Sequence, residues 1–68
     1  MTHLELKKHR NALGLTVKQL ALVIGCNPVH VRRMETDPTV ASSRPINPQA
    51  ERLIIAYLEG YRPADWPA

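Results

Sequence analysis

Apolar positions follow a helical period along most of the chain. From Val17 to Ile24 and again from Ala50 to Tyr57, apolar residues fall at i, i+3, i+4 and i+7, which places them on one face of a helix. No segment alternates between apolar and polar residues as a half-buried strand would, so the sequence predicts an all-α fold. The expected core residues are Leu6, Ala12, Leu13, Val17, Leu20, Ala21, Ile24, Val31, Met34, Ala50, Leu53, Ile54 and Tyr57.

Polar caps and glycines indicate where each helix begins and ends. Thr2 and Thr16 are each followed three residues later by Glu or Gln, the pattern of a capping box. Two Asn-Pro pairs supply a cap and a first helical residue at positions 27 and 47. Glycine follows three of the predicted helices and readily adopts the left-handed conformation that ends many helices. We therefore expect helices over residues 3–13, 17–24, 28–35 and 48–59, with a loop over 37–46.

Length and composition fit a small cytoplasmic protein. The chain has 68 residues, which suits one domain over residues 1–68, and 44% of them are apolar, which argues against disorder. A single cysteine excludes an intramolecular disulfide and fits a reducing compartment. Neither a signal peptide nor an apolar run long enough for a membrane span is recognisable. We expect a cytoplasmic, nucleoid-associated protein that does not bind membranes.

Positive charge is concentrated in the first two-thirds of the chain. The net charge is +3, yet residues 1–44 hold seven Lys/Arg against three Asp/Glu, whereas residues 45–68 hold two against three. A basic surface of this kind favours a polyanionic partner, usually nucleic acid. Simple solubility is the alternative that charge alone leaves open.

The third predicted helix has two chemically different faces. With a rotation of about 100° per residue, Val31 and Met34 lie on one side and Val29, Arg32 and Arg33 on the other. Arginine can donate two hydrogen bonds to guanine, and a small apolar side chain can contact the methyl group of thymine. The face therefore predicts insertion into a DNA major groove; a solvated helix face is the alternative.

Two polar residues extend this face. Asn27 lies at the helix N-terminus, where its side chain and the free backbone N–H groups can reach a base edge or a phosphate. His30 lies at the boundary between the two faces, and its contact could be to a base or to phosphate. The candidate base contacts are Asn27, Val29, His30, Arg32 and Arg33.

The stretch from Thr16 to Glu35 resembles the helix-turn-helix of the Cro/C1-type (XRE-like) repressor family. The matching positions are Arg10, Leu13, Gly14, Leu15, Thr16, Gln19, Leu20, Ala21, Gly25, Val31, Arg33 and Glu35. The resemblance covers roughly residues 4–60 and implies a compact lambda-repressor-like domain of four, possibly five, helices, with the helix-turn-helix over residues 16–36 and a C-terminal helix and tail over 47–68. A narrower similarity, carried by small size and the ending Gly60-Tyr61-Arg62-Pro63, is to the anti-CRISPR-associated (Aca) regulators, which repress the operons in which they lie.

The family resemblance also implies roles for individual residues. It implies a structural ion pair between Arg10 and Glu35, a dimer, and an inverted-repeat operator. Val17 departs from the family pattern, because many members have a polar phosphate-contacting residue there. The candidate contacts to the DNA backbone are Thr16, Lys18, Pro28, Thr36, Ser42, Ser43 and Arg44.

The last predicted helix carries more apolar surface than its core stripe needs. Ile55 and Leu58 point away from that stripe, and Tyr61 and Trp66 follow. Either the tail or a second copy of the chain can cover such a surface. We expect a two-fold homodimer through these four residues, which would set two recognition helices one DNA turn, roughly 34 Å, apart.

The remaining reactive residues form no catalytic pattern. The three histidines lie on two different predicted helices without an acidic partner at metal-ligand spacing, and the serines match no nucleophile motif. We therefore expect no enzymatic activity, no metal, no cofactor and no small-molecule ligand. Cys26, at a turn position that is usually apolar, is expected to be a buried and inert thiol.

Together these features predict a sequence-specific double-stranded DNA-binding transcriptional regulator. A dimeric repressor of a phage or mobile-element operon, such as an anti-CRISPR operon, is the function we expect. Two alternatives remain open: an antitoxin-like or adaptor protein that acts mainly through protein binding, and an RNA-binding regulator that uses the same basic face.

Overall fold

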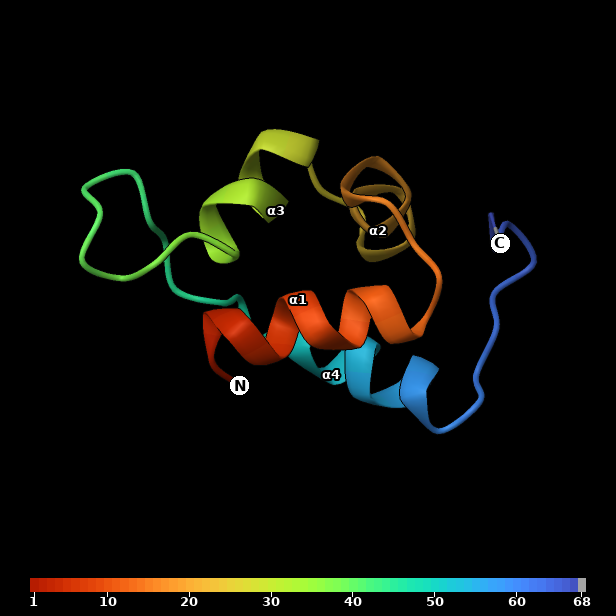
Figure 1. Cartoon of the computed structure of the whole chain (residues 1–68). Helices are drawn as coiled ribbons and strands as arrows, with labels where there is room; N and C mark the ends of the chain where they lie inside the picture. The colour runs from red at the N-terminus through yellow and green to blue at the C-terminus, as the bar shows by residue number, and fades with distance from the viewer. Residues whose placement is uncertain (68) are drawn as a thin grey trace.

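Four helices make up the secondary structure of residues 1–67, which the computed structural model describes (Figure 1). They are α1 (His3–Ala12), α2 (Val17–Ile24), α3 (Pro28–Met34) and α4 (Pro48–Leu58), and no strand occurs in this range. The all-α prediction is confirmed, and three of the helices end a residue earlier than expected. Residues 59–67 contain no fifth helix, and Ala68, the last residue of the predicted tail, lies outside the described residues.

The expected caps start all four helices. Thr2 and Thr16 both form capping boxes, in which the threonine hydroxyl accepts from the backbone N–H three residues on and that residue's side chain accepts from the threonine N–H. Asn27 and Asn47 cap α3 and α4, each with proline at the first helical position. These bonds satisfy N–H groups that the first turn of a helix cannot satisfy internally.

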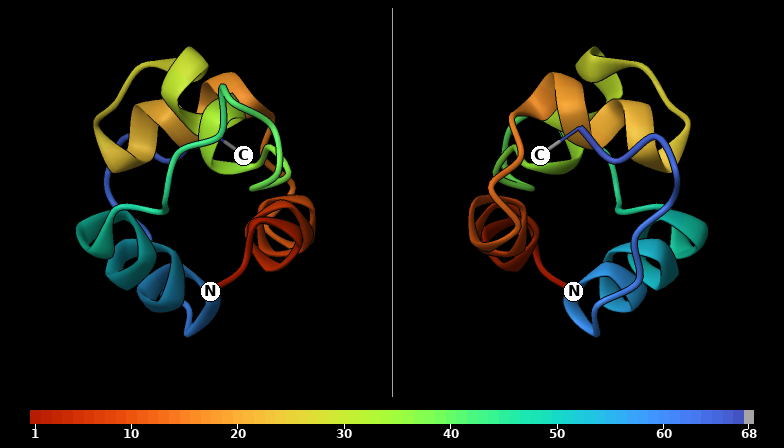
Figure 2. Two further views of the ribbon diagram at one scale, coloured as in Figure 1. Left: turned by 90° about the vertical axis from the view of Figure 1, so that its left-hand side faces the viewer. Right: turned by 90° about the vertical axis from the view of Figure 1, so that its right-hand side faces the viewer.

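The helices form two layers that enclose one apolar core. α2 and α3 lie together in one layer, and α1 and α4 lie in the other, as the end-on views show (Figure 2). The buried cluster at their contact consists of Leu6, Leu15, Leu20, Ala21, Val31, Met34 and Ile54. This two-layer arrangement places α3 and α4 on opposite sides of the core.

Several core predictions were wrong or only partly right. Ala12 is exposed, because it lies six residues beyond Leu6 and so falls about 120° away from the buried stripe of α1. Four other predicted core residues are only partly buried: Leu13, Val17, Ile24 and Leu53. Leu15, between α1 and α2, is buried although no helical period marks it.

The tail folds back onto the chain through its aromatic residues. The Trp66 ring packs edge-on against Tyr57 with centroids 5.0 Å apart, and the Arg62 guanidinium lies 4.3 Å from the Trp66 ring centre. Tyr57 in turn donates its hydroxyl to the Val23 carbonyl at 2.7 Å, which joins α4 to α2. Trp66, expected at a dimer interface, therefore packs within its own chain.

None of the helices in the described part of the chain is both long and apolar enough to cross a membrane.

Candidate nucleic-acid interface

The turn between α2 and α3 reverses the chain within three residues. Gly25 ends α2 in the left-handed conformation, with φ of +73°, and donates to the carbonyls of Ala21 and Leu22. The Cys26 N–H also donates to the Ala21 carbonyl, at 2.9 Å. Because a side chain is strained at this φ, glycine lets the turn be tight enough for α3 to pack directly across α2.

α3 presents two different faces, as its sequence predicts. Val31 and Met34 are 0% and 1% exposed and anchor the helix on the core. Val29 is 47% exposed, and both Arg32 and Arg33 lie on the surface. The outward direction of these three side chains is thus confirmed.

Both outward arginines of α3 are available for an external partner. Within residues 1–67, neither the Arg32 nor the Arg33 guanidinium makes an ion pair or an intramolecular hydrogen bond. At the start of the helix, the Asn27 side-chain oxygen accepts from the Val29 N–H at 2.9 Å, so its amide NH₂ group is the part left to contact a ligand. His30 is also exposed. The face therefore consists of hydrogen-bond donors around one apolar side chain.

A bidentate ion pair holds the other end of α3. Arg10 of α1 donates to both carboxylate oxygens of Glu35, at 2.7 and 3.1 Å, and its third guanidinium nitrogen donates to the Leu15 carbonyl at 3.0 Å. The two side chains are only 12% and 9% exposed. The pair implied by the family resemblance is present, and it fixes α1 to the end of α3 while neutralising the Glu35 carboxylate.

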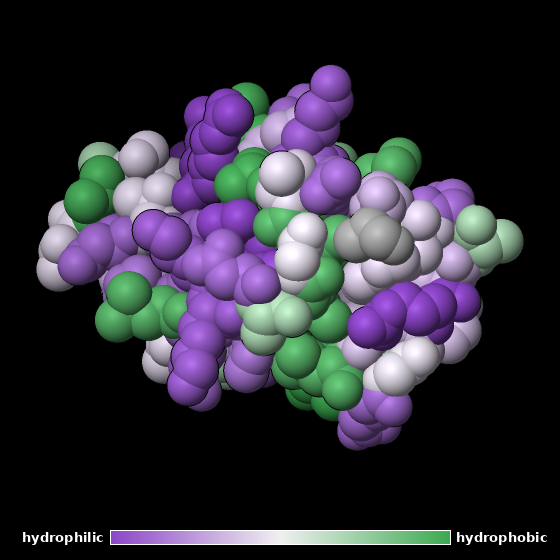
Figure 3. Space-filling view, turned by 45° about the vertical axis from the view of Figure 1, so that its right-hand side comes forward, coloured by the Kyte–Doolittle hydropathy of each residue, from purple (hydrophilic) through white to green (hydrophobic). Residues whose placement is uncertain are grey.

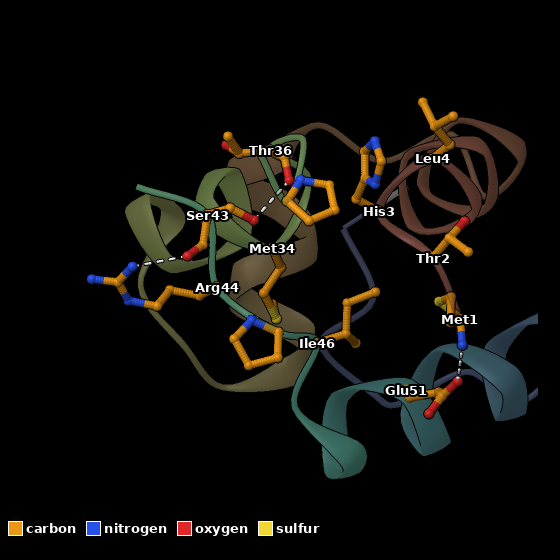
Figure 4. A pocket seen from close by; sticks show the side chains of 12 residues that line it. Met1, Thr2, His3, Leu4, Met34, Thr36, Ser43, Arg44, Ile46 and Glu51 are labelled. Carbon is orange, nitrogen blue, oxygen red and sulfur yellow. Dashed lines mark hydrogen bonds and ion pairs between the residues drawn. The ribbon is translucent and has the colours of Figure 1, made fainter. Parts of the chain in front are cut away.

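The end of the 37–46 loop docks against the last turn of α3. The Arg44 N–H donates to the Arg33 carbonyl at 3.1 Å, and the Ser43 hydroxyl donates to the Thr36 carbonyl at 2.9 Å (Figure 4). The Thr36 hydroxyl donates to the Arg32 carbonyl at 2.7 Å. Ser43 and Thr36 therefore use their hydroxyl protons internally, and as phosphate donors they are weaker candidates than the sequence indicated.

The other predicted backbone contacts, apart from Pro28, keep a free donor. Arg44 donates from one guanidinium nitrogen to the carbonyls of Ala41 and Ser43, and its side chain points away from Met34 and Ile46 (Figure 4). Lys18 and Ser42 are exposed, and Pro28 is partly buried without a backbone donor. The Thr16 hydroxyl accepts its capping bond from Gln19 and keeps its proton.

An open groove of about 790 Å³ lies between the start of α1, the 37–46 loop and α4. Met34 and Ile46 line its middle. Ser43 and Glu51, at its edges, are already paired, Glu51 with the terminal ammonium group at 2.8 Å (Figure 4).

In residues 1–67 every buried side-chain nitrogen or oxygen has a hydrogen-bond partner, and no three His, Cys, Asp or Glu side chains gather as metal ligands.

Two groups near the interface have shifted pKa values. Burial raises the pKa of the Cys26 thiol, which is partly buried rather than fully buried as expected. Hydrogen bonds from the backbone and hydroxyl of Thr39 lower the pKa of Asp37 at the start of the loop. The thiol is thus mostly protonated at neutral pH, and Asp37 keeps its negative charge beside the basic residues.

Comparison of the chain with protein-family models, curated proteins and solved structures found no match in any of the three. Function is therefore inferred from the chain's own geometry and charge.

Proposed function

We propose that the chain is a sequence-specific double-stranded DNA-binding protein that regulates transcription through a helix-turn-helix formed by α2 and α3. One observation carries the proposal. α3 is anchored from below by Val31 and Met34, while Arg32 and Arg33 project outward and their side chains have no hydrogen-bond or ion-pair partner among residues 1–67. A helix held in this way can enter a groove without losing its contacts to the core.

The outward residues of α3 suit the chemistry of the major groove. An α-helix with its side chains is about 10–12 Å in diameter, which fits a groove roughly 12 Å wide. Arg33 or Arg32 can donate two bonds to guanine O6 and N7, and Val29 can meet the methyl group of thymine. The amide of Asn27 and the ring of His30 add polar contacts near the N-terminal end.

Flanking residues can fix the protein on the sugar-phosphate backbone. Lys18 at the start of α2 and Arg44 beside the end of α3 supply positive charge, and Thr16 and Ser42 can donate hydroxyl bonds. Contacts to phosphate carry little sequence information but set register and orientation. They also predict an affinity that falls as salt concentration rises.

The regulatory mechanism that fits a small binding domain is steric. A protein bound over a promoter excludes RNA polymerase, so we propose repression of its own or a neighbouring phage or mobile-element operon in the cytoplasm. The resemblance to the XRE-like family, and more narrowly to the Aca regulators, makes an anti-CRISPR operon one such target. Protein binding as an adaptor is the second candidate, because α4 exposes Ile55 and Leu58.

Selection of bound sites from a random pool of DNA duplexes tests the proposal. We expect enrichment of one short motif that contains at least one guanine, and retention of that duplex in the presence of excess RNA. The affinity for the selected motif should fall with added salt, because phosphate contacts release counterions. A pool without enrichment, or stronger retention on RNA, would contradict DNA recognition.

A further inference from the structure

Val29 is the apolar member of the outward face of α3. Since successive residues rotate by about 100°, it lies almost diametrically opposite the midpoint of Val31 and Met34, which anchor the helix on the core. In the space-filling view, hydrophilic side chains project at the top of the molecule, where α2 and α3 lie, and apolar atoms are exposed between them (Figure 3). Val29 is therefore the side chain of α3 that points most directly at a ligand on this face.

The start of α3 holds Val29 in a fixed conformation. Its backbone N–H donates to the side-chain oxygen of the Asn27 cap at 2.9 Å. A valine in a helix adopts one χ1 rotamer in about 90% of cases, so its two methyl groups point in fixed directions. A side chain that is ordered before binding loses little entropy on contact, which preserves the contact energy for discrimination between ligands.

Arg33 is the donor nearest to Val29 on this face. It follows Val29 by four positions and is rotated from it by about 40°, whereas Arg32 is rotated by about 60° to the other side. The Arg33 carbonyl accepts from the N–H groups of Thr36 and Arg44, at 3.3 and 3.1 Å, so the 37–46 loop fixes its backbone. Its guanidinium has no hydrogen-bond or ion-pair partner among residues 1–67. The face thus offers a rigid apolar group beside a free two-pronged donor.

One kind of base step in the major groove matches this pair of groups. Guanine presents its O6 and N7 acceptors there, and the C5 methyl of thymine is the apolar group that the four bases offer in the groove. Side chains about one helical turn apart contact successive bases when a helix lies in the major groove, as in zinc fingers. 5-Methylcytosine carries its methyl group at the same ring position as thymine.

We propose that Val29 and Arg33 together read a 5-methylpyrimidine beside a guanine, and that Val29 recognises the methyl group rather than the base that carries it. A valine can hydrogen-bond neither to O4 of thymine nor to the amino group of cytosine, so it distinguishes the pyrimidines by the methyl group alone. The inference rests on the proposed function and adds a chemical class of ligand, a duplex with either thymine or 5-methylcytosine at that position. Methylation of a cytosine there strengthens binding.

Two matched pairs of duplexes test the reading of the methyl group. In the selected motif, the thymine beside the guanine that Arg33 reads is replaced by uracil, which removes the methyl group and keeps the base-pairing groups. The second pair carries 5-methylcytosine or cytosine at the same position, opposite guanine. In both pairs we expect the methylated duplex to bind wild-type protein about fourfold more tightly by fluorescence anisotropy, the effect of burying one methyl group.

Two valine variants assign this discrimination to α3. Val29→Ala should bring both affinity ratios to about one while the preference for the neighbouring guanine is kept. Val40→Ala is the matched control, because Val40 is also 47% exposed but lies in the 37–46 loop, and it should keep both ratios at about fourfold. Circular dichroism should show equal helix content in both variants and the wild type.

The outcomes separate this inference from the proposed function. A pool of duplexes that yields no enriched motif would refute sequence-specific binding, and this inference with it. A selected motif without a thymine beside a guanine, or equal wild-type affinity for the thymine and uracil duplexes, would overturn the inference and leave DNA recognition standing. Discrimination that persists in Val29→Ala would also overturn it, because another side chain would then contact the methyl group.

Discussion

Arginines of the same chemistry have different roles because of what surrounds them. The Arg10 guanidinium donates hydrogen bonds to Glu35 and to the Leu15 carbonyl. One guanidinium nitrogen of Arg62 donates to the carbonyls of Tyr57 and Tyr61. The Arg33 guanidinium has no such partner in the part of the chain that the structure describes. An arginine that is already satisfied loses bonds when it meets a ligand, whereas an unpaired one only exchanges water for the ligand. DNA binding should therefore depend on α3 and not on basic residues in general.

Replacing Arg33 with alanine tests this dependence. We expect a loss of about 1–3 kcal/mol in binding free energy on the selected site and a relaxed preference at one base pair, because one bidentate contact to guanine is removed. Fluorescence anisotropy with the selected duplex and its single-base variants measures both effects. Lys8→Ala, which removes the same charge from an exposed position on α1, should change affinity much less. Equal weakening on every duplex would assign Arg33 to a phosphate contact.

The α2–turn–α3 element depends on backbone conformation at Gly25. A methyl group added there would meet no atom within 4 Å, so the cost of a side chain is the left-handed φ alone. The capping bonds of Thr16 and Asn27 then set where each helix begins, and the turn sets how they cross. The orientation of α3 relative to α2 is thus set within this element.

Gly25→Ala should reduce the free energy of unfolding by about 1 kcal/mol, since an L-residue resists the left-handed region. Gly25→Asn should cost less, because asparagine tolerates that conformation better. Urea titration followed by circular dichroism compares the two variants with the wild type. If alanine and asparagine cost the same, the loss would have to come from something other than backbone strain.

Across the protein, a few long-range contacts join the two layers. Arg10–Glu35 links α1 to the end of α3, and the Tyr57 hydroxyl links α4 to the Val23 carbonyl of α2. A chain of 68 residues buries a small core and is only marginally stable, so each of these contacts is a sizeable part of the total. They also keep the α3 face at a constant orientation to the rest of the molecule.

Glu35→Ala should lower the free energy of unfolding by about 3 kcal/mol, because the guanidinium of Arg10 is left nearly buried without its carboxylate. Glu35→Gln should cost less, since its side-chain oxygen can still accept a hydrogen bond. Chemical denaturation measures both, and Asp65→Ala removes the same charge from an exposed position as a control. Equal stability of Glu35→Ala and the control would show that the pair contributes nothing net.

Local features of the sequence predict the helices and the character of α3. Caps, proline and glycine act within a few residues, so Thr2, Thr16, Asn27 and Asn47 mark helix starts without knowledge of the fold. The spacing of Val31 and Met34 against Arg33 likewise predicts which side of α3 faces outward, because helical rotation alone sets it. The burial of both apolar residues confirms this.

Features that depend on contacts between distant segments required the tertiary structure. By pattern, Trp66 could cover its own chain or a neighbour, and we expected the neighbour; the fold brings it onto Tyr57 of its own chain. The Ser43 hydroxyl resembled a phosphate donor by sequence, and only the docked loop places it where it donates to the Thr36 carbonyl. The opposite placement of α3 and α4 has no local signal at all, because helix direction in space follows from how two turns and a loop pack together. Helix boundaries and faces are short-range properties of the chain, whereas partners and orientations are long-range ones.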